Sequence, residues 1–310
     1  MKRAVFFLIC AFLLALTAFT PGCSREAEVA REVTVVGDDF GRQVAIPAVP
    51  ERIISLTPSG TEILFALGLG PRVVGGTDYD NYPPEALTLP KVGDYENPNL
   101  ENIVALEPDL VLADSIHQKA VEELENLGIP VLAFDPVSVA GVYDTILRIG
   151  AATGTMEAAE GLVAQMKSEV AALTAPLANL AEEDKPTVYY EVWYEPLITV
   201  GPQTYIHDMI TLAGGRNIAA DAQSPWPEYS LEVLIEKDPE VIIRPRVLMG
   251  IVMSEEQDFA NRPGWENITA VREGRIYFVE DDLLSRPGPR CVQGLEKLVQ
   301  ILHPDLYPTE

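Results

Sequence analysis

Cysteine, histidine and basic residues are scarce in this chain of 310 residues. It has three cysteines and three histidines, and 22 lysines and arginines stand against 47 aspartates and glutamates. Three cysteines are too few for a disulfide framework, and three isolated histidines do not form the cluster that a zinc site needs. The net charge of −25 argues against nucleic-acid binding and against electrostatic attachment to an anionic membrane.

Sequence motifs of catalysis and nucleotide binding are also missing. The chain has no P-loop, nucleophile-elbow or zincin motif, and the glycines at 68 and 70 follow a predicted helix instead of opening one. We therefore expect a protein that is not an enzyme and has no resident cofactor or metal. An extracellular enzyme or sensor is the less favoured alternative, and it would need a clustered acid–base group.

Only one apolar stretch is long, and it lies at the N-terminus. Two basic residues precede an apolar run at residues 4–19, which is short for a membrane-spanning helix and typical of an export signal. The small residues at 20–22 stand directly before Cys23, an arrangement that resembles the lipobox of bacterial lipoproteins. The resemblance implies cleavage after residue 22 and a lipid on Cys23. The alternative is a plain signal peptide with an incidental cysteine.

The lipoprotein interpretation predicts the location and charge of the mature chain. We expect a signal peptide at residues 1–22, a polar tether at 23–31 and an extracytoplasmic body anchored to the outer or periplasmic face of the cell membrane. The mature chain keeps 20 basic and 47 acidic residues, a net charge of −27. Cys291 is then the only cysteine left for the body, so no internal disulfide is expected.

Strands alternate with helices along the body. Residues 33–36 and 43–46 flank a glycine-containing turn and predict a hairpin. Further predicted strands are residues 52–56, 72–75, 109–113, 130–134, 187–193, 241–244 and 275–279. Predicted helices are residues 62–67, 100–106, 118–126, 139–152, 156–180, 205–213, 231–236 and 289–302. Ser59 and Glu62 have the spacing of a capping box for the first of these helices, and Pro176 should kink or end the long one.

This alternation predicts an α/β fold of two lobes, each with a central, mainly parallel sheet flanked by helices. We expect an N-terminal lobe at 32–138, connecting helices with one long helix at 139–185, and a C-terminal lobe at 186–310. A ligand cleft should open between the lobes.

An internal repeat relates the two predicted lobes. Residues 100–112 align with residues 231–243 at a constant offset of 131, and each copy is a short helix, a proline and a buried strand. Asn99 and Ser230 precede the helices and are good N-caps. Each helix then carries one acid in its first turn, Glu101 or Glu232. The helix dipole alone would favour an acid there, but the matched placement suggests a second role.

Five segments of the chain resemble the helical-backbone solute-binding proteins of bacterial ABC importers, and within that group most closely the cobalamin-binding members. They are residues 50–62, 74–86, 97–112, 213–218 and 263–279, and the resemblance extends over residues 32–308. It implies a monomer that captures a small-molecule metal chelate, cobalamin or a related corrinoid, and delivers it to a permease dimer with ATPase subunits. Haem and ferric-siderophore binders share this scaffold and are the alternative.

The resemblance also implies roles for particular residues. Glu101 and Glu232 match the acids that dock onto permease arginines, while Tyr79, Tyr95 and Trp226 match aromatic residues that contact cobalamin. Aromatic side chains suit the broad, partly apolar corrin disc. The predicted ligand-binding residues are Tyr79, Tyr82, Tyr95, Trp193, Tyr194, Trp226, Tyr229 and Arg246. The alternative for each aromatic residue is loop packing, and Trp265 is expected to be structural.

Other charged and titratable residues near predicted strand ends leave two interpretations open. Arg244, Arg246, Arg286 and Arg290 could bind phosphate, propionate or siderophore carboxylates, or they could pair with surface acids. His117 is a candidate axial ligand to cobalt or iron, and the alternative is a solvated loop histidine.

Overall fold

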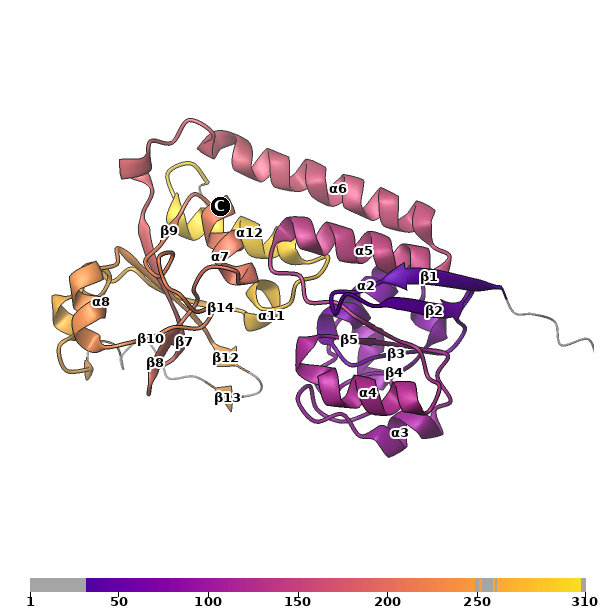
Figure 1. The fold of residues 1–310 in the computed structure, drawn as a ribbon. Coiled ribbons are helices and arrows are strands. Elements are labelled where there is room, and N and C mark those ends of the chain that lie inside the picture. Colours follow the sequence, from indigo (N-terminus) through magenta and orange to yellow (C-terminus); the bar gives the residue numbers. More distant parts are fainter. Residues whose placement is uncertain (1–31, 249–250, 253–258, 260, 308–310) are drawn as a thin grey trace, which may run out of the picture. The chain divides into compact units, whose positions relative to one another are not determined.

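The computed structural model describes residues 32–248, 251–252, 259 and 261–307 (Figure 1). The predicted signal peptide, the tether and Cys23 lie outside the described residues. Within them, no helix combines the length and apolar character needed to cross a membrane. Cys291 is buried as a free thiol.

The N-terminal lobe begins with a hairpin and contains a four-stranded parallel sheet. Strands β1 (Val33–Gly37) and β2 (Gln43–Pro47) pair antiparallel, as expected. The sheet has the order β4-β3-β5-β6, and all its pairs are parallel. Its strands are β3 (Ile53–Ser55), β4 (Val73–Gly75), β5 (Leu110–Ala113) and β6 (Val131–Ala133). The helices of this lobe are α2 (Pro58–Ala66), α3 (Leu100–Ala105) and α4 (Gln118–Asn126).

Two helices follow the N-terminal lobe. Helix α5 (Val139–Thr153) is capped by the Ser138 hydroxyl, which accepts from the Gly141 backbone N–H, and it ends at Gly154 in the left-handed conformation that glycine adopts freely. Helix α6 (Met156–Thr174) has 19 residues, which corresponds to about 28 Å at 1.5 Å per residue. It packs on α5 and on α12 (Cys291–Leu302), so it contacts elements on both sides of the connection (Figure 1).

The C-terminal lobe has a mixed sheet of order β10-β8-β7-β11-β14, with β9 also beside β7. Four of its strands are parallel to one another: β7 (Thr187–Trp193), β9 (Arg216–Asn217), β11 (Val241–Pro245) and β14 (Ile276–Val279). Strands β8 (Leu197–Thr199) and β10 (Glu228–Tyr229) extend the sheet antiparallel. The helices are α7 (Tyr205–Leu212), α8 (Leu231–Lys237), α10 (Thr269–Arg272), α11 (Asp281–Leu284) and α12, and β12 (Val247–Leu248) pairs with β13 (Ile251–Val252).

Alternating side chains divide each sheet between two apolar cores. Along β5, Leu110 and Leu112 enter one buried cluster, whereas Val111 and Ala113 enter another. Along β11, Val241 enters the first of these clusters and Ile242 a third. The first cluster runs from the N-terminal sheet through α5 and α6 to α12, so it is shared by both lobes. Burial of both sheet faces explains why the parallel strands are almost continuously apolar.

The structure confirms the α/β fold and the internal repeat, and it corrects several local predictions. Asn99 and Ser230 cap α3 and α8 as expected, by accepting from backbone N–H groups three residues on. The Ser59–Glu62 capping box was wrong, because α2 begins at Pro58 and Thr57 is its cap. The long helix ends at Thr174 rather than at residue 180, just before Pro176. The short strands β8, β9 and β10 were not predicted.

Candidate functional site

Part of the predicted ligand-binding set lies at or after the carboxyl ends of parallel strands, where ligands bind in open α/β sheets. Strand β4 ends at Gly75 and leads to Tyr79 and Tyr82, and β7 ends at Trp193. The segment after β4, residues 77–83, has no helix or strand of its own. We call it the 77–83 segment.

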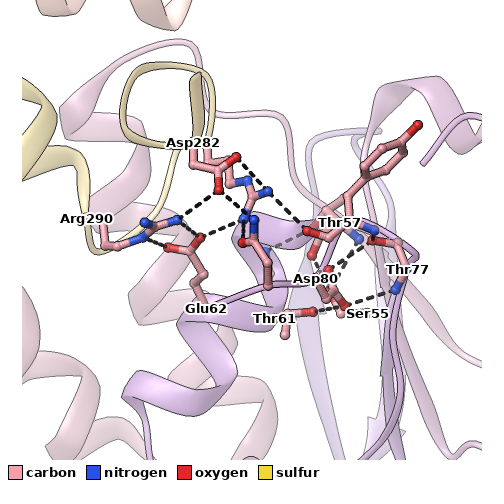
Figure 2. Close-up of polar contacts among 12 residues, drawn as sticks. Ser55, Thr57, Thr61, Glu62, Thr77, Asp80, Asp282 and Arg290 are labelled. Carbon is pink, nitrogen blue, oxygen red and sulfur yellow. Dashed lines mark hydrogen bonds and ion pairs between the residues drawn. The ribbon is translucent and has the colours of Figure 1, made fainter. Parts of the chain in front are cut away.

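A buried aspartate attaches the 77–83 segment to α2. Asp80 is 1% exposed. Its Oδ2 accepts hydrogen bonds from the Thr61 hydroxyl and the Thr77 backbone N–H, both at 2.9 Å, and its Oδ1 accepts from the Thr77 hydroxyl at 3.0 Å (Figure 2). Burial raises the pKa of Asp80, although these hydrogen bonds and the charge of Lys91 oppose the shift. Gly76 is required beside it, because a Cβ there would lie 2.0 Å from Asp80 Oδ2.

Glu62 on α2 binds two arginines from the C-terminal lobe. Its carboxylate accepts from Arg290 Nε at 2.8 Å and Nη2 at 2.6 Å, and from Arg286 Nη1 at 3.2 Å. Figure 2 shows Glu62 reaching toward Arg290, with Asp282 beside them. Desolvation alone would lower the pKa of Arg290, but the hydrogen bonds and charge of Glu62 outweigh it and raise that pKa. Glu62 is therefore an ion-pair residue instead of the capping residue that local spacing predicted.

The same arginines contact the 77–83 segment. Arg286 donates from Nη2 to the Tyr79 carbonyl at 3.1 Å and from Nη1 to Asn81 Oδ1 at 2.7 Å. Asn81 in turn donates to Asp282 at 2.8 Å, and Asp282 pairs with Arg286 at 2.7 Å. We call Glu62, Asn81, Asp282, Arg286 and Arg290 the interlobe cluster. It joins α2 and the 77–83 segment to the α11–α12 region.

Tyr82 is the more exposed tyrosine of this segment. It is 42% exposed, and the guanidinium of Arg290 lies 4.2 Å from its ring centroid. One ring face is therefore covered by a cation, which favours a fixed ring orientation. Tyr79 is half-buried, and its backbone carbonyl is held by Arg286.

Tyr95, from the loop before α3, forms a compact group with Asp114 and His117, which follow β5. The Tyr95 hydroxyl donates to Asp114 Oδ2 at 2.5 Å, and its ring lies edge-on to His117 with centroids 5.4 Å apart. Burial, followed by the Asp114 charge and hydrogen bond, raises the pKa of Tyr95 well above its usual value.

The structure excludes the solvated-loop interpretation of His117 and gives it no free ring nitrogen. The side chain is buried, its Nε2 lies 2.6 Å from the Tyr95 carbonyl, and its Nδ1 lies 2.8 Å from Asp114 Oδ1. Both ring nitrogens contact protein atoms, which argues against axial ligation by His117. Among the residues described, no group of three or more histidines, cysteines or carboxylates is arranged to hold a metal.

The aromatic candidates of the C-terminal lobe lie on or next to β7 and β10, the two strands on either side of β8. Trp193 at the end of β7 pairs in register with Ile198 of β8, which pairs with Glu228 of β10. Trp193 is 36% exposed and Trp226, just before β10, is 52% exposed. These two large apolar side chains are therefore available to a ligand.

Tyr194 and Tyr229 have stronger packing roles than Trp193 and Trp226. Both pack against the third buried cluster, and the Tyr229 hydroxyl donates to the Ile218 carbonyl at 3.2 Å. Tyr194 lies edge-on to Trp265 and faces the guanidinium of Arg262, 3.8 Å from the ring centroid. Trp265 is 2% exposed in this cluster, which confirms its structural role.

A second buried glutamate holds two arginines within the C-terminal lobe. Glu191, in the middle of β7, pairs with Arg262 at 2.5 Å and with Arg244 at 3.1 Å. We call these three residues the C-lobe triad. Its arginines are buried, so Arg244 is neither a surface pair nor a solvent-facing cation.

Among the four arginines singled out from the sequence, Arg246 alone is exposed to solvent. It is exposed and lies 5.6 Å from the Phe278 ring centroid.

The two docking candidates, Glu101 and Glu232, are also exposed, and neither forms an ion pair with any residue in the described part of the chain.

A cavity of about 10 Å³ between Thr57, Phe134, Pro136 and Pro287 is large enough only for a water molecule.

The chain belongs to the periplasmic binding protein family, whose model matches residues 53–283. ABC transporter substrate-binding proteins of this family work with permease and ATPase components. The chain is 34% identical to an uncharacterised ABC transporter substrate-binding lipoprotein of Bacillus subtilis, over 96% of this chain and 98% of that protein.

Two further relatives have names that state a ligand. A vitamin B12-binding protein of Salmonella choleraesuis is 32% identical, over 81% of this chain and 90% of that protein. The solved structure of the periplasmic heme-binding protein RhuT of Roseiflexus sp. RS-1 matches with a TM-score of 0.72 at 31% identity, covering 82% of this chain and 98% of that one.

Sequence reasoning missed the acids that organise the site. Glu62 was interpreted as a cap, and Asp80, Glu191 and Asp282 were not singled out. The partners of Glu62 lie 224 and 228 residues away along the chain. A usable signal was present only for Glu191, an acid inside an otherwise apolar strand, because a buried charge requires a partner.

Proposed function

We propose that this chain is an extracytoplasmic, lipid-anchored receptor that captures cobalamin or a related corrinoid and delivers it to an ABC permease dimer. The observation that carries the ligand assignment is the combination of exposed aromatic side chains with four arginines, Arg244, Arg262, Arg286 and Arg290, that are already paired with buried glutamates. Anchoring through Cys23 and a monomeric state belong to the same proposal.

The aromatic side chains supply the contact area that a corrin needs. Tyr82, Trp193 and Trp226 are 42%, 36% and 52% exposed, although large apolar side chains are usually buried. Tyr82 follows β4 of the N-terminal lobe, Trp193 ends β7 of the C-terminal lobe, and Trp226 lies just before β10. Flat amphipathic rings suit a broad disc that is apolar on its faces and polar at its rim.

The charges favour a corrinoid over haem or a ferric siderophore. Haem brings two propionates, which arginine would bind best through a free guanidinium fork. In this chain Arg286 and Arg290 pair with Glu62, and Arg244 and Arg262 pair with Glu191. A ligand carboxylate would have to compete with these buried carboxylates. A corrinoid fringed with neutral amides avoids that competition.

Calorimetry on the soluble body, residues 32–310, tests the ligand. We expect saturable binding of cyanocobalamin and cobinamide and weaker or no binding of haemin and ferrichrome. Trp226→Ala should weaken cyanocobalamin binding at least about tenfold, since truncating a contact aromatic residue costs 1–2 kcal/mol or more. Leu127→Ala is the control, because Leu127 is 62% exposed at the end of α4, outside the predicted cleft. Saturable haemin binding without cyanocobalamin binding would instead support the haem alternative.

Glu101 and Glu232 are proposed to dock the receptor on the permease. They occupy equivalent first-turn positions of α3 and α8, one in each lobe, and a two-fold permease can present one arginine to each. We expect Glu101→Ala and Glu232→Ala to keep cyanocobalamin affinity and lose permease binding in reconstituted liposomes. Loss of an interfacial charge partner costs about 2–5 kcal/mol when the pair is desolvated. Glu160→Ala on α6 is the matched surface control, and unaltered docking of the double variant would refute this role.

A further inference from the structure

We propose that Arg286 and Arg290, held by Glu62, are positioning residues of the ligand-binding site. They hold the 77–83 segment in its binding conformation before ligand arrives, and they do so from the opposite lobe. This inference rests on the proposed corrinoid-binding function and adds to it the residues that preorganise the site.

The 77–83 segment depends on external contacts for its order. It lacks regular secondary structure, and Asp78, Asn81 and Tyr82 are exposed. Asp80 attaches it to α2 on one side, and Arg286 attaches it on the other through the Tyr79 carbonyl and Asn81 Oδ1. Ordering such a segment on binding would cost conformational entropy, so a segment held in advance binds more tightly.

Arg290 sets the orientation of the Tyr82 ring. Its guanidinium lies 4.2 Å from the ring centroid on one face, while Nε and Nη2 bind Glu62 in a two-point contact. The fork fixes the plane of the guanidinium and thereby the plane of the tyrosine. The other ring face remains for a ligand. A lysine in place of Arg290 would keep the positive charge, but it lacks the planar guanidinium that binds Glu62 at two points and lies over the Tyr82 ring.

The charges of the interlobe cluster indicate positioning rather than anion capture. Arg286 and Arg290 are balanced by Glu62 and Asp282, with ion pairs at 2.6–3.2 Å and one at 3.9 Å. Glu62 is only 3% exposed, so it is shielded from solvent competition. The arginines therefore contribute geometry to the site without adding net positive charge.

The test combines hydrogen exchange on the ligand-free protein with calorimetry. In Arg290→Lys and Glu62→Gln we expect faster amide exchange within residues 77–83, unchanged exchange in β7, and a cyanocobalamin Kd raised about tenfold. Arg42→Lys is the matched control. Arg42 also pairs with carboxylates, those of Asp38 and Glu125, and lies over an aromatic ring, Phe40 at 5.0 Å, but it contacts none of the segment. It should leave the exchange of residues 77–83 and the Kd at wild-type values.

A double-variant cycle separates positioning from direct contact. If Arg290 acts through Tyr82, Arg290→Lys should have little further effect on Kd in a Tyr82→Ala background. Additive effects, or wild-type exchange of residues 77–83 in both Arg290→Lys and Glu62→Gln, would overturn the proposal. If wild-type protein fails to bind cyanocobalamin, the proposed function fails, and the exchange measurement still decides whether the cluster orders the segment.

Discussion

The protein uses the same arrangement of one buried glutamate and two arginines in two places, with different surroundings. In the C-lobe triad, all three side chains belong to one lobe, and Arg244 and Arg262 are 4% and 5% exposed beside a fully buried Glu191. Arg262 is further enclosed by aromatic rings, including that of Phe259 at 4.0 Å. The triad is therefore part of a packed core.

The interlobe cluster lies closer to solvent and joins two lobes. Its arginines are 12% and 13% exposed, and they also contact backbone and side chains of the 77–83 segment. We infer that the same ion-pair chemistry stabilises a packed core in the C-lobe triad and fixes the geometry of the 77–83 segment in the interlobe cluster. Partial exposure lowers the contribution of the interlobe cluster to the free energy of unfolding. Its contacts with the 77–83 segment, which has no regular secondary structure, make it more important for the geometry of the proposed ligand site.

Removal of the two glutamates should separate these roles. We expect Glu191→Ala to lower the free energy of unfolding by about 3–5 kcal/mol, because it leaves two buried guanidinium groups without a counter-charge. Glu62→Ala should cost less, about 1–3 kcal/mol, since its arginines can reach water and Asp282. Urea unfolding at pH 7 measures both. Glu160→Ala on the exposed face of α6 is the control, and equal losses for the two buried glutamates would contradict the comparison.

A smaller effect is expected for Asp80, which supports the 77–83 segment from the α2 side. Its raised pKa means that the folded protein binds this proton more readily than the unfolded chain does. The ionised carboxylate therefore costs stability at neutral pH, and this cost disappears as the pH falls through the raised value toward 3.8.

Asp80→Asn should remove that cost. The amide oxygen can still accept from the Thr61 hydroxyl and the Thr77 backbone N–H, while the amide NH2 donates to the Thr77 hydroxyl, which donates to Asp80 in the wild type. We expect an unfolding free energy at pH 7 equal to wild type or higher by less than about 1 kcal/mol. The advantage of the variant should shrink as the pH is lowered. If the stability advantage of Asp80→Asn over wild type increased at lower pH, folding would lower the pKa of Asp80 instead of raising it, which contradicts the direction assigned here.

The parts of the fold that depend on local pattern could be predicted from the sequence. Strand β7 and helix α4 have the predicted bounds, and the repeat at offset 131 places α3 with α8 and β5 with β11. An apolar strand between two capped, polar helices can be recognised from the few residues that form it and flank it. Strands β8, β9 and β10 have two or three residues each, too few for an alternating pattern to be recognised.

The candidate site was predictable in its residue types and less so in its contacts. Tyr82, Trp193 and Trp226 are exposed, and their contact with a ligand stays a prediction. The role of Glu62 could not be predicted, because a Ser-x-x-Glu spacing is identical whether the acid caps a helix or binds arginines more than 200 residues away. For His117, a loop was expected, and the structure has a 3-10 helix at Ser115–His117 with Asp114 as its cap.

A crystal structure of the body with cyanocobalamin tests the central claim, that aromatic side chains bind the ligand while the arginines stay paired. We expect Tyr82, Trp193 and Trp226 to lie against the corrin, with the Arg290–Glu62 contacts near their present 2.6 and 2.8 Å. A ligand held by Arg286 and Arg290 with Glu62 displaced, or bound away from the aromatic residues, would contradict it.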